Sequence, residues 1–423
     1  MTSIFFILYR YQKWLILYFF LFMLFSRAFG EKRILFIGNS YTAVNDLPGL
    51  VYNVALANGD TIIYDAYDPG GYTFELHSAD ASAIAKINSN SWDYVILQEQ
   101  SQRPSFPPSQ VQQEVYPFAM RLDSFIHANN PCTQTVFYMT WGRKYGDQSN
   151  CANYPPLCTY AGMQERLRAS YLEMGDMMHA RVSPVGISFQ NSIAADSTLE
   201  LYNSDQSHPS PAGSYLAACT FYATLYKKSP VGTSYLAGLD SVTAAFLQNI
   251  AAHTVLDSLA NWKIGVYEPN ASFSFSQIGL TASFVSESIY STSHQWSFGS
   301  NLATPVYTFP NGGDFNVTHI ACDACRCDSI TQLIHISGIG INETENSDIL
   351  VYPNPVREEI CISDPNNAIL KIELLNSEGK YLNVSRFKME NFQTLSLPTS
   401  SGMYFIKIFR KDGKVEDRKL VVD

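Results

Sequence analysis

A serine, a histidine and an aspartate in this sequence have the types and spacing of a nucleophile, a general base and an orienting acid. Ser40 follows Gly38-Asn39 at the end of an apolar run. Asp205 and His208 stand three residues apart in a late polar segment, so a turn can bring the carboxylate to the imidazole Nδ1. A serine hydroxyl needs such a base to become a good nucleophile. Taken singly, the serine is more often a turn or helix-capping residue, and the Asp–His pair a solvated loop pair.

Hydrolysis by this set also needs preorganised donors for the oxyanion that forms at the attacked carbonyl. The backbone N–H of Ser40 is one candidate. A second is Gly71, in a glycine-rich turn, because a glycine N–H can approach a ligand closely. The amides of Gln98 and Gln100, at the end of a third apolar run, are candidates for the remaining donor. A plain tight turn and a polar strand end are the structural alternatives.

The elements that must position these side chains alternate between strands and helices over residues 31–265. Continuous apolar runs predict buried strands, at Arg33–Ile37, Thr61–Ala66, Tyr94–Leu97 and Thr135–Met139. Helical stretches follow at Leu47–Asn58, Gln110–Ala128, Gly162–His179, Pro211–Tyr226 and Ser241–Leu259. This alternation predicts a parallel sheet covered on both faces, a three-layer α/β/α domain of flavodoxin-like type. Such open sheets bind ligands at the carboxyl ends of their strands, where Ser40 is expected.

With these blocks in order, residues 33–228 resemble the SGNH hydrolases, the GDSL-type esterase and lipase superfamily. Phe36–Thr42 (FIGNSYT) is similar to the first block of the family, with Asn39 in place of the usual aspartate. Gly71 matches the oxyanion glycine of the second block, and Asp205–His208 (DQSH) matches the terminal D-x-x-H.

The third block departs from the family pattern. Its usual G-x-N-D is replaced by Gln98–Ser101 (QEQS), so Gln100 falls on the position of the asparagine donor and Gln98 is the alternative. The resemblance implies a two-step ester hydrolysis. Ser40 attacks the carbonyl, His208 acts as its base, and no metal or organic cofactor is required.

Two further residues near these blocks are candidates for substrate contact. Trp141 follows the fourth predicted strand and can stack a sugar ring or an acyl chain, with packing as the alternative. Asn39 adjoins the nucleophile and is a second candidate for substrate contact. His77 is expected to be structural, and Glu99 is assigned no catalytic role.

The sequence pattern changes over residues 266–340. Short alternating runs separated by Gly, Asn and Pro turns predict a small β-sandwich. Gln295–Gly299, Pro305–Phe309 and Gly313–Val317 resemble the PKD domain, an immunoglobulin-like module.

Residues 341–348 (INETENSD) read as a polar linker, and residues 349–423 as a second small β-sandwich domain. The Tyr352–Pro355 opening (YPNP), the Gly402–Ile406 strand (GMYFI) and the Lys419–Val422 end resemble the type A C-terminal sorting domain of the type IX secretion system of Bacteroidota. This resemblance implies contact with that secretion machinery. It also implies passage across the outer membrane, followed by attachment to the cell surface or release.

Residues 1–30 read as a signal peptide. Arg10 and Lys13 precede the apolar run Trp14–Phe25, and Ala28–Gly30 supplies small residues for cleavage. An uncleaved anchor is the alternative. After cleavage no stable transmembrane segment is expected.

Eight cysteines fit an oxidising compartment. Cys151 and Cys158 bracket a short loop and predict a local disulfide. Cys322, Cys325 and Cys327 form C-x2-C-x-C without the further ligands that a metal site needs.

Composition excludes two broad classes. Hydrophobic residues make up 46% and charged residues 16%, which is unlike a disordered chain. A formal net charge of −10 opposes binding to nucleic acid, which needs a basic face.

The sequence thus predicts an exported serine esterase, with O-deacetylation of carbohydrates as the first expected activity and lipid or small-ester hydrolysis as the second. The rival is a cell-surface carbohydrate-binding or adhesion protein on an inactive hydrolase fold. The presence of Ser40, Asp205 and His208 together favours the enzyme. Acyl transfer by the same residues stays open.

Overall fold

The computed structural model describes residues 31–337, 349–386, 392–397 and 400–423. The predicted signal peptide and the predicted linker at 341–348 lie outside these residues. The described chain divides into two compact units. The first runs to Ser272 and also contains residues 287–294 and 320–329. The second contains residues 273–286, 295–319 and the rest of the chain from Ile330.

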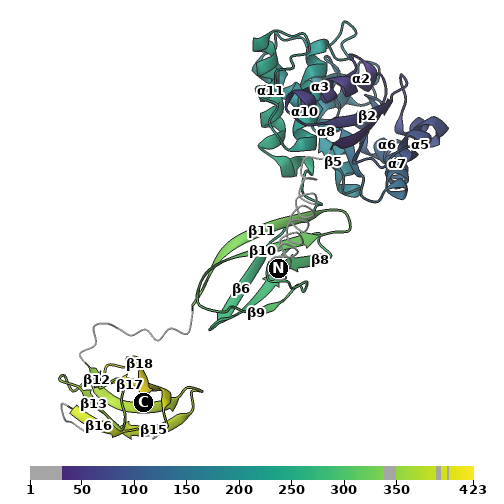
Figure 1. Ribbon diagram of the computed structural model, residues 1–423. Helices are drawn as coiled ribbons and strands as arrows, with labels where there is room; N and C mark the ends of the chain where they lie inside the picture. Colours follow the sequence, from purple (N-terminus) through teal and green to yellow (C-terminus); the bar gives the residue numbers. More distant parts are fainter. Residues whose placement is uncertain (1–30, 338–348, 387–391, 398–399) are drawn as a thin grey trace, which may run out of the picture. The chain divides into compact units, whose positions relative to one another are not determined.

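A five-stranded parallel sheet in the order β2-β1-β3-β4-β5 forms the centre of the first unit (Figure 1). Its strands are β1 (Lys32–Ile37), β2 (Ile62–Tyr67), β3 (Tyr94–Leu97), β4 (Gln134–Tyr138) and β5 (Arg181–Ser183). The four predicted strands are confirmed, with ends shifted by one residue at most. The three-residue β5 was not predicted, because Arg-Val-Ser has no apolar run.

Helices cover both faces of this sheet (Figure 1). They are α2 (Ser40–Ala43), α3 (Leu47–Ala57), α4 (Phe74–Ala79), α5 (Ala81–Asn88), α6 (Pro108–Glu114), α7 (Tyr116–Asn129), α8 (Tyr160–Met177), α9 (Val185–Ala195), α10 (Pro211–Tyr226) and α11 (Ser241–Leu256). Three short 3-10 turns are η2 (Arg103–Ser105), η3 (Pro155–Cys158) and η4 (Leu259–Trp262).

The alternation of side chains along each strand divides the core into two apolar layers. Ile34 and Phe36 of β1 belong to one buried cluster, together with side chains of α3, α9, α10 and α11. Leu35 and Ile37 belong to the other, with side chains of α4 to α8. All four strand residues are at most 1% exposed. The predicted three-layer α/β/α fold is therefore confirmed.

One predicted helix, Gln110–Ala128, is interrupted. The chain leaves helical geometry at Val115 (φ −121°, ψ −56°) and restarts as α7 at Tyr116. Pro117 explains the break, because its ring cannot continue a helix from the preceding turn but is well suited to the first turn of a new one.

Among the described residues after η4, the regular elements are all strands. The first group forms the sheets β6-β7-β9 and β11-β10-β8, from β6 (Phe273–Ile278), β7 (Thr281–Ser286), β8 (Ser293–Trp296), β9 (Val306–Thr308), β10 (Gly313–Cys322) and β11 (Cys327–Ile336). Phe273, Phe284, Trp296 and Val317 belong to its buried core. This is the small β-sandwich predicted for the region.

The last part of the chain has the sheets β12-β13-β16 and β15-β14-β17-β18. The strands are β12 (Leu350–Tyr352), β13 (Glu359–Ser363), β14 (Ile369–Asn376), β15 (Tyr381–Arg386), β16 (Phe392–Ser396), β17 (Gly402–Arg410) and β18 (Val415–Val422). They pair antiparallel and enclose an apolar core that includes Ile362, Leu374, Ile406 and Leu420. The second predicted all-β domain is confirmed as well.

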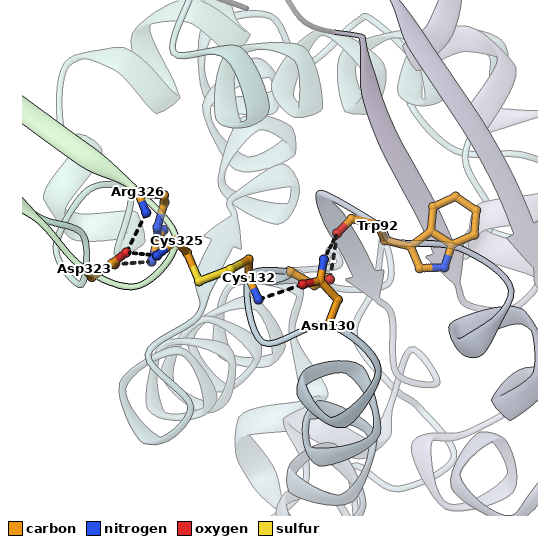
Figure 2. Close-up of a disulfide and its surroundings, with 7 residues drawn as sticks. Trp92, Asn130, Cys132, Asp323, Cys325 and Arg326 are labelled. Atoms are coloured by element: carbon orange, nitrogen blue, oxygen red, sulfur yellow. Dashed lines mark hydrogen bonds and ion pairs between the residues drawn. A yellow bond between two sulfur atoms is a disulfide. The ribbon is translucent and has the colours of Figure 1, made fainter. Parts of the chain in front are cut away.

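Three disulfides use six of the cysteines. The predicted Cys151–Cys158 bond is present. Cys322 pairs with Cys327, and Cys325 pairs with Cys132, which lies 193 residues earlier in the chain (Figure 2). The C-x2-C-x-C cluster is therefore consumed by disulfides.

Asp323 shapes the turn that presents Cys325. Its carboxylate accepts the backbone N–H groups of Cys325 and Arg326, both at 2.6 Å (Figure 2). On the other side of the bond, Asn130 accepts the N–H of Cys132 at 3.1 Å. Residues 320–329 belong to the first unit, so this crosslink lies within that unit.

We expect the double variant Cys132→Ser/Cys325→Ser to lose about 2–5 kcal/mol of unfolding free energy, since this crosslink closes a long loop of the unfolded chain. Thermal and denaturant unfolding of the exported chain measures the loss. The matched control is Cys151→Ser/Cys158→Ser, whose loop spans 7 residues and should cost less. Equal stability of the wild type and the Cys132/Cys325 variant would contradict a stabilising crosslink.

Candidate active site

Ser40 lies at the carboxyl end of β1, as the first residue of α2. Asn39 caps this short helix, because its Oδ1 accepts the N–H of Tyr41 at 3.1 Å. Gly38 is needed for close packing: a Cβ there would lie 2.3 Å from Thr42 Oγ1 and 2.9 Å from Gln98 Oε1. The local sequence thus turns the chain sharply and places Ser40 at the edge of the sheet.

The structure brings Ser40, His208 and Asp205 together. His208 Nε2 lies 2.8 Å from Ser40 Oγ, and His208 Nδ1 is hydrogen-bonded to the Asp205 carboxylate. Asp205 Oδ1 also accepts the backbone N–H of Ser207 at 3.1 Å and of His208 at 2.9 Å. One carboxylate therefore fixes both the turn and the imidazole, which explains the D-x-x-H spacing.

Asp205 is ionised at neutral pH. Its partial burial alone would raise the pKa, but the hydrogen bonds from the His208 imidazole and from two backbone N–H groups outweigh this and lower the pKa below its ordinary value. A negative Asp205 holds His208 with its proton on Nδ1 and leaves Nε2 free to accept a proton from Ser40.

The segment that carries His208 is one side of a short hairpin. Asn203 N–H donates to the His208 carbonyl at 2.8 Å, and Ser210 N–H donates to the Leu201 carbonyl at 2.9 Å. A bridge between Tyr202 and Pro209 lies between these two bonds. The backbone around the histidine is therefore fixed by paired hydrogen bonds.

Trp141 connects this hairpin to the segment that carries Ser40. Its indole N–H donates to the Ser207 carbonyl at 3.0 Å, and its ring stacks on Tyr41 with centroids 4.9 Å apart. The Tyr41 hydroxyl lies 2.5 Å from Ser207 Oγ. Trp141 is 0% exposed and also stacks on Phe189.

The expectation that Trp141 stacks against substrate is therefore corrected. A fully buried ring between two aromatic neighbours leaves no face for a sugar or an acyl chain. Its place in the structure is to hold the His208 hairpin next to Ser40. The sequence signal for this role is Tyr41, directly after the serine, because its ring is the one on which Trp141 stacks.

Asn39 is likewise a positioning residue and not a substrate contact. It is 2% exposed, and its Nδ2 donates to the Tyr72 carbonyl at 2.8 Å. That bond fastens the turn containing Gly71 beside Ser40. Gly71 has φ +73°, a left-handed conformation in which an L side chain would be strained.

The two glutamines differ in what they offer. Gln98 is completely buried, and its amide nitrogen donates to Asn39 Oδ1 at 2.9 Å and to the Glu99 carbonyl at 2.5 Å. Both amide protons are thus in use. The expectation that Gln98 donates to the oxyanion is therefore wrong. Gln100 is half-buried and its amide donates to Gln102 Oε1 at 3.1 Å, which leaves a second amide proton.

Glu99 and His77 are buried side chains that hydrogen-bond to backbone groups next to the site. Glu99 is completely buried and accepts the N–H of Phe74 at 3.0 Å and of Gln100 at 2.6 Å. Burial raises the pKa of Glu99 to about 7. His77 Nε2 lies 2.8 Å from the Gly38 carbonyl, and burial lowers the pKa of His77, so the ring is neutral and structural, as expected.

One family model matches the chain. Residues 350–423 match the secretion system C-terminal sorting domain. A search of curated proteins gave no match. The residues matched are those whose motifs resemble the type IX sorting domain.

Solved structures resemble the first two parts of the chain. A DUF4886 family protein from Bacteroides uniformis is 19% identical over 54% of this chain and 95% of its own, with a TM-score of 0.46. A candidate SGNH hydrolase from Slackia heliotrinireducens is 26% identical over 46% of this chain and 100% of its own, with a TM-score of 0.38. The PKD1 domain of the Vibrio cholerae metalloprotease PrtV is 24% identical over 16% of this chain and 96% of its own, with a TM-score of 0.15.

The first unit is a three-layer α/β/α domain that carries a serine, a histidine and an aspartate in hydrogen-bond contact at the carboxyl edge of its parallel sheet. The chain continues with a small β-sandwich and ends with residues 350–423, which match the sorting-domain model. A sorting domain of this kind marks a protein for export to the cell surface or outside. Within the part of the chain that the structure describes, no helix has the length and apolar character to cross a membrane.

Glu99 makes stability depend on pH. Because its pKa is raised in the folded state above the ordinary value of 4.5, its contribution is fully present below pH 4.5 and is lost as the pH rises through about 7. We expect Glu99→Gln to gain stability relative to the wild type between pH 5 and pH 8, by on the order of 2–3 kcal/mol. Chemical denaturation at several pH values measures this difference.

The control for that series is Glu165→Gln, an exposed carboxylate on α8. Because this side chain lies in water, its substitution should not reproduce the pH-dependent gain of Glu99→Gln. If the stability difference between Glu99→Gln and the wild type also stayed constant with pH, the raised pKa of Glu99 would be wrong.

Proposed function

We propose that the first unit hydrolyses carboxylic esters with Ser40 as nucleophile, His208 as general base and Asp205 as the orienting carboxylate. The observation that carries this proposal is the 2.8 Å contact between Ser40 Oγ and His208 Nε2, with the aspartate on Nδ1. The unit would correspond to a catalytic domain of residues 31–265, with residues 266–340 as a spacer.

In the first step, His208 Nε2 takes the hydroxyl proton as Ser40 Oγ attacks the ester carbonyl carbon. The bond from that carbon to the alcohol oxygen then breaks, and His208 returns the proton to the departing alcohol. Ser40 is left as an acyl ester. In the second step His208 takes a proton from water, the hydroxide attacks the acyl carbon, and Ser40 leaves with that proton as the acid is released.

The negative oxygen formed in each step needs donors that are already in place. The backbone N–H of Ser40 is available because the first N–H groups of a helix have no intrahelical acceptor. The N–H of Gly71 is held near it by the Asn39 bond to Tyr72. We assign the third donor to the free amide proton of Gln100.

The preferred substrate in this proposal is an acetylated carbohydrate. Export beyond the outer membrane gives access to extracellular polymers, and no step above requires a soluble cytoplasmic partner. Small-ester hydrolysis remains the simpler form of the same chemistry. A surface-binding role without catalysis is less well supported, because a binding protein has no need for the Ser40–His208–Asp205 geometry.

The variants Ser40→Ala and His208→Ala should each lower kcat for a chromogenic acetyl ester by roughly 10³-fold or more. The variant Asp205→Asn should have a kcat about 10²–10⁴-fold lower than the wild type, because the imidazole loses its fixed tautomer. The exported chain is assayed with the acetyl ester and with acetylated xylan, beside circular dichroism to verify folding. Wild-type levels in a folded Ser40→Ala variant would refute the nucleophile.

Substitutions of Gln98 and Gln100 distinguish a structural role from a catalytic one. Gln100→Leu should lower kcat about 10–100-fold with little change in stability, as expected for one lost oxyanion donor. Gln98→Leu should lower the unfolding free energy by about 2–4 kcal/mol, because it leaves several buried polar groups without partners. Unfolding and kcat are measured for both. The reverse pattern would assign the donor to Gln98.

A further inference from the structure

A cavity of about 280 Å³ lies beside the His208 hairpin. We call it the Tyr145 cavity. It is formed by the loop after β4, the start of α8, the end of α9 and the segment that leads into the hairpin. Its lining residues are Lys144, Tyr145, Tyr160, Ile193, Ser197, Leu199, Glu200, Leu201 and Tyr202.

Two contacts join the walls of this cavity to the histidine. The N–H of Lys144 donates to the Gln206 carbonyl at 3.0 Å, two residues before His208. Leu201 and Tyr202 form the hairpin side that faces Pro209 and Ser210. A ligand in the cavity therefore contacts the same hairpin that presents His208 to Ser40.

The charges in the cavity wall cancel. Lys144 Nζ lies 2.5 Å from Glu200 Oε2, and this pair is the charged part of the lining. The Lys144 ammonium also lies 5.9 Å from the centroid of the Tyr145 ring. An ionic ligand would have to disrupt this pair, whereas a neutral hydroxylated ligand can use both groups as hydrogen-bond partners.

The remaining wall includes an exposed aromatic ring. Tyr145 is 63% exposed, so its ring can be covered by a ligand. A ligand with an apolar face and several hydroxyl groups can cover this ring and hydrogen-bond to the Lys144–Glu200 pair.

We propose that the Tyr145 cavity is a subsite for a neutral sugar ring adjacent to the one that carries the ester. Its volume lies just below the range of about 300–1,000 Å³ for ligand pockets, which suits a single ring and not a long segment of polymer. The inference rests on the proposed function, which it deepens: the substrate is an acetylated oligosaccharide. An acyl chain fits less well, because it would leave the Lys144–Glu200 ion pair without hydrogen-bond partners from the ligand.

The kinetic test compares two substrates on the full exported chain, a chromogenic acetyl ester and an acetylated xylo-oligosaccharide. Tyr145→Ala should raise KM for the oligosaccharide about ten-fold more than KM for the small ester. The matched control is Tyr64→Ala, an exposed tyrosine on β2, which should not change the ratio of the two KM values.

A binding test is independent of catalysis. Ser40→Ala protein is titrated by calorimetry with unacetylated xylo-, manno- and gluco-oligosaccharides. At least one should bind, and the added Tyr145→Ala change should weaken that binding about ten-fold. Absence of binding by all three, or equal binding with and without Tyr145, would overturn the sugar subsite.

The two tests separate the two proposals. If Ser40→Ala abolishes small-ester hydrolysis but Tyr145→Ala leaves the KM ratio unchanged, the proposed function stands and the subsite is wrong. If the wild type hydrolyses neither substrate, the proposed function fails and the titration alone decides the subsite. If Tyr145→Ala instead raises KM selectively for a long-chain acyl ester, the cavity binds an acyl chain and the sugar assignment is wrong.

Discussion

The reciprocal hydrogen bonds between Asn39 and Gln98 are the constraint on which the rest of the site depends. The Asn39 N–H donates to Gln98 Oε1, and Gln98 Nε2 donates to Asn39 Oδ1, both at 2.9 Å between buried groups. With the Asn39 bond to Tyr72, they join the ends of β1 and β3 and the turn after β2. Buried polar groups are costly without partners, so this network has one satisfactory arrangement, and Ser40 and Gly71 take their places from it.

A second set of contacts brings in the late part of the chain. Tyr41, next to Ser40, stacks on Trp141 and contacts Ser207, while the Trp141 indole N–H donates to the Ser207 carbonyl. His208 follows Ser207 directly. Ser40 and His208, 168 residues apart, are thus positioned by residues that are adjacent to each of them in sequence. Rigid support of this kind is what a reaction needs when its groups must be aligned before the substrate arrives.

Much of this could be predicted from sequence, and the failures share a cause. Continuous apolar runs located β1 to β4, and the spacing of Asp205 and His208 indicated their contact, because both signals are local. Trp141 and Gln98 were misjudged because burial depends on what packs around a residue. The partner of Cys132 could not be found, since a bond to Cys325 leaves no trace in spacing. The Glu99 carboxylate is a similar case: only the fold shows it bound to two backbone N–H groups.

Covalent trapping tests the reactivity of Ser40 most directly. The exported chain is treated with a fluorophosphonate ester, and peptide mass spectrometry locates the adduct. We expect one adduct, on Ser40, formed much more slowly when His208 is replaced by alanine. A folded protein that forms no adduct, or one labelled elsewhere with Ser40 unmodified, would contradict the claim that His208 activates Ser40 as a nucleophile.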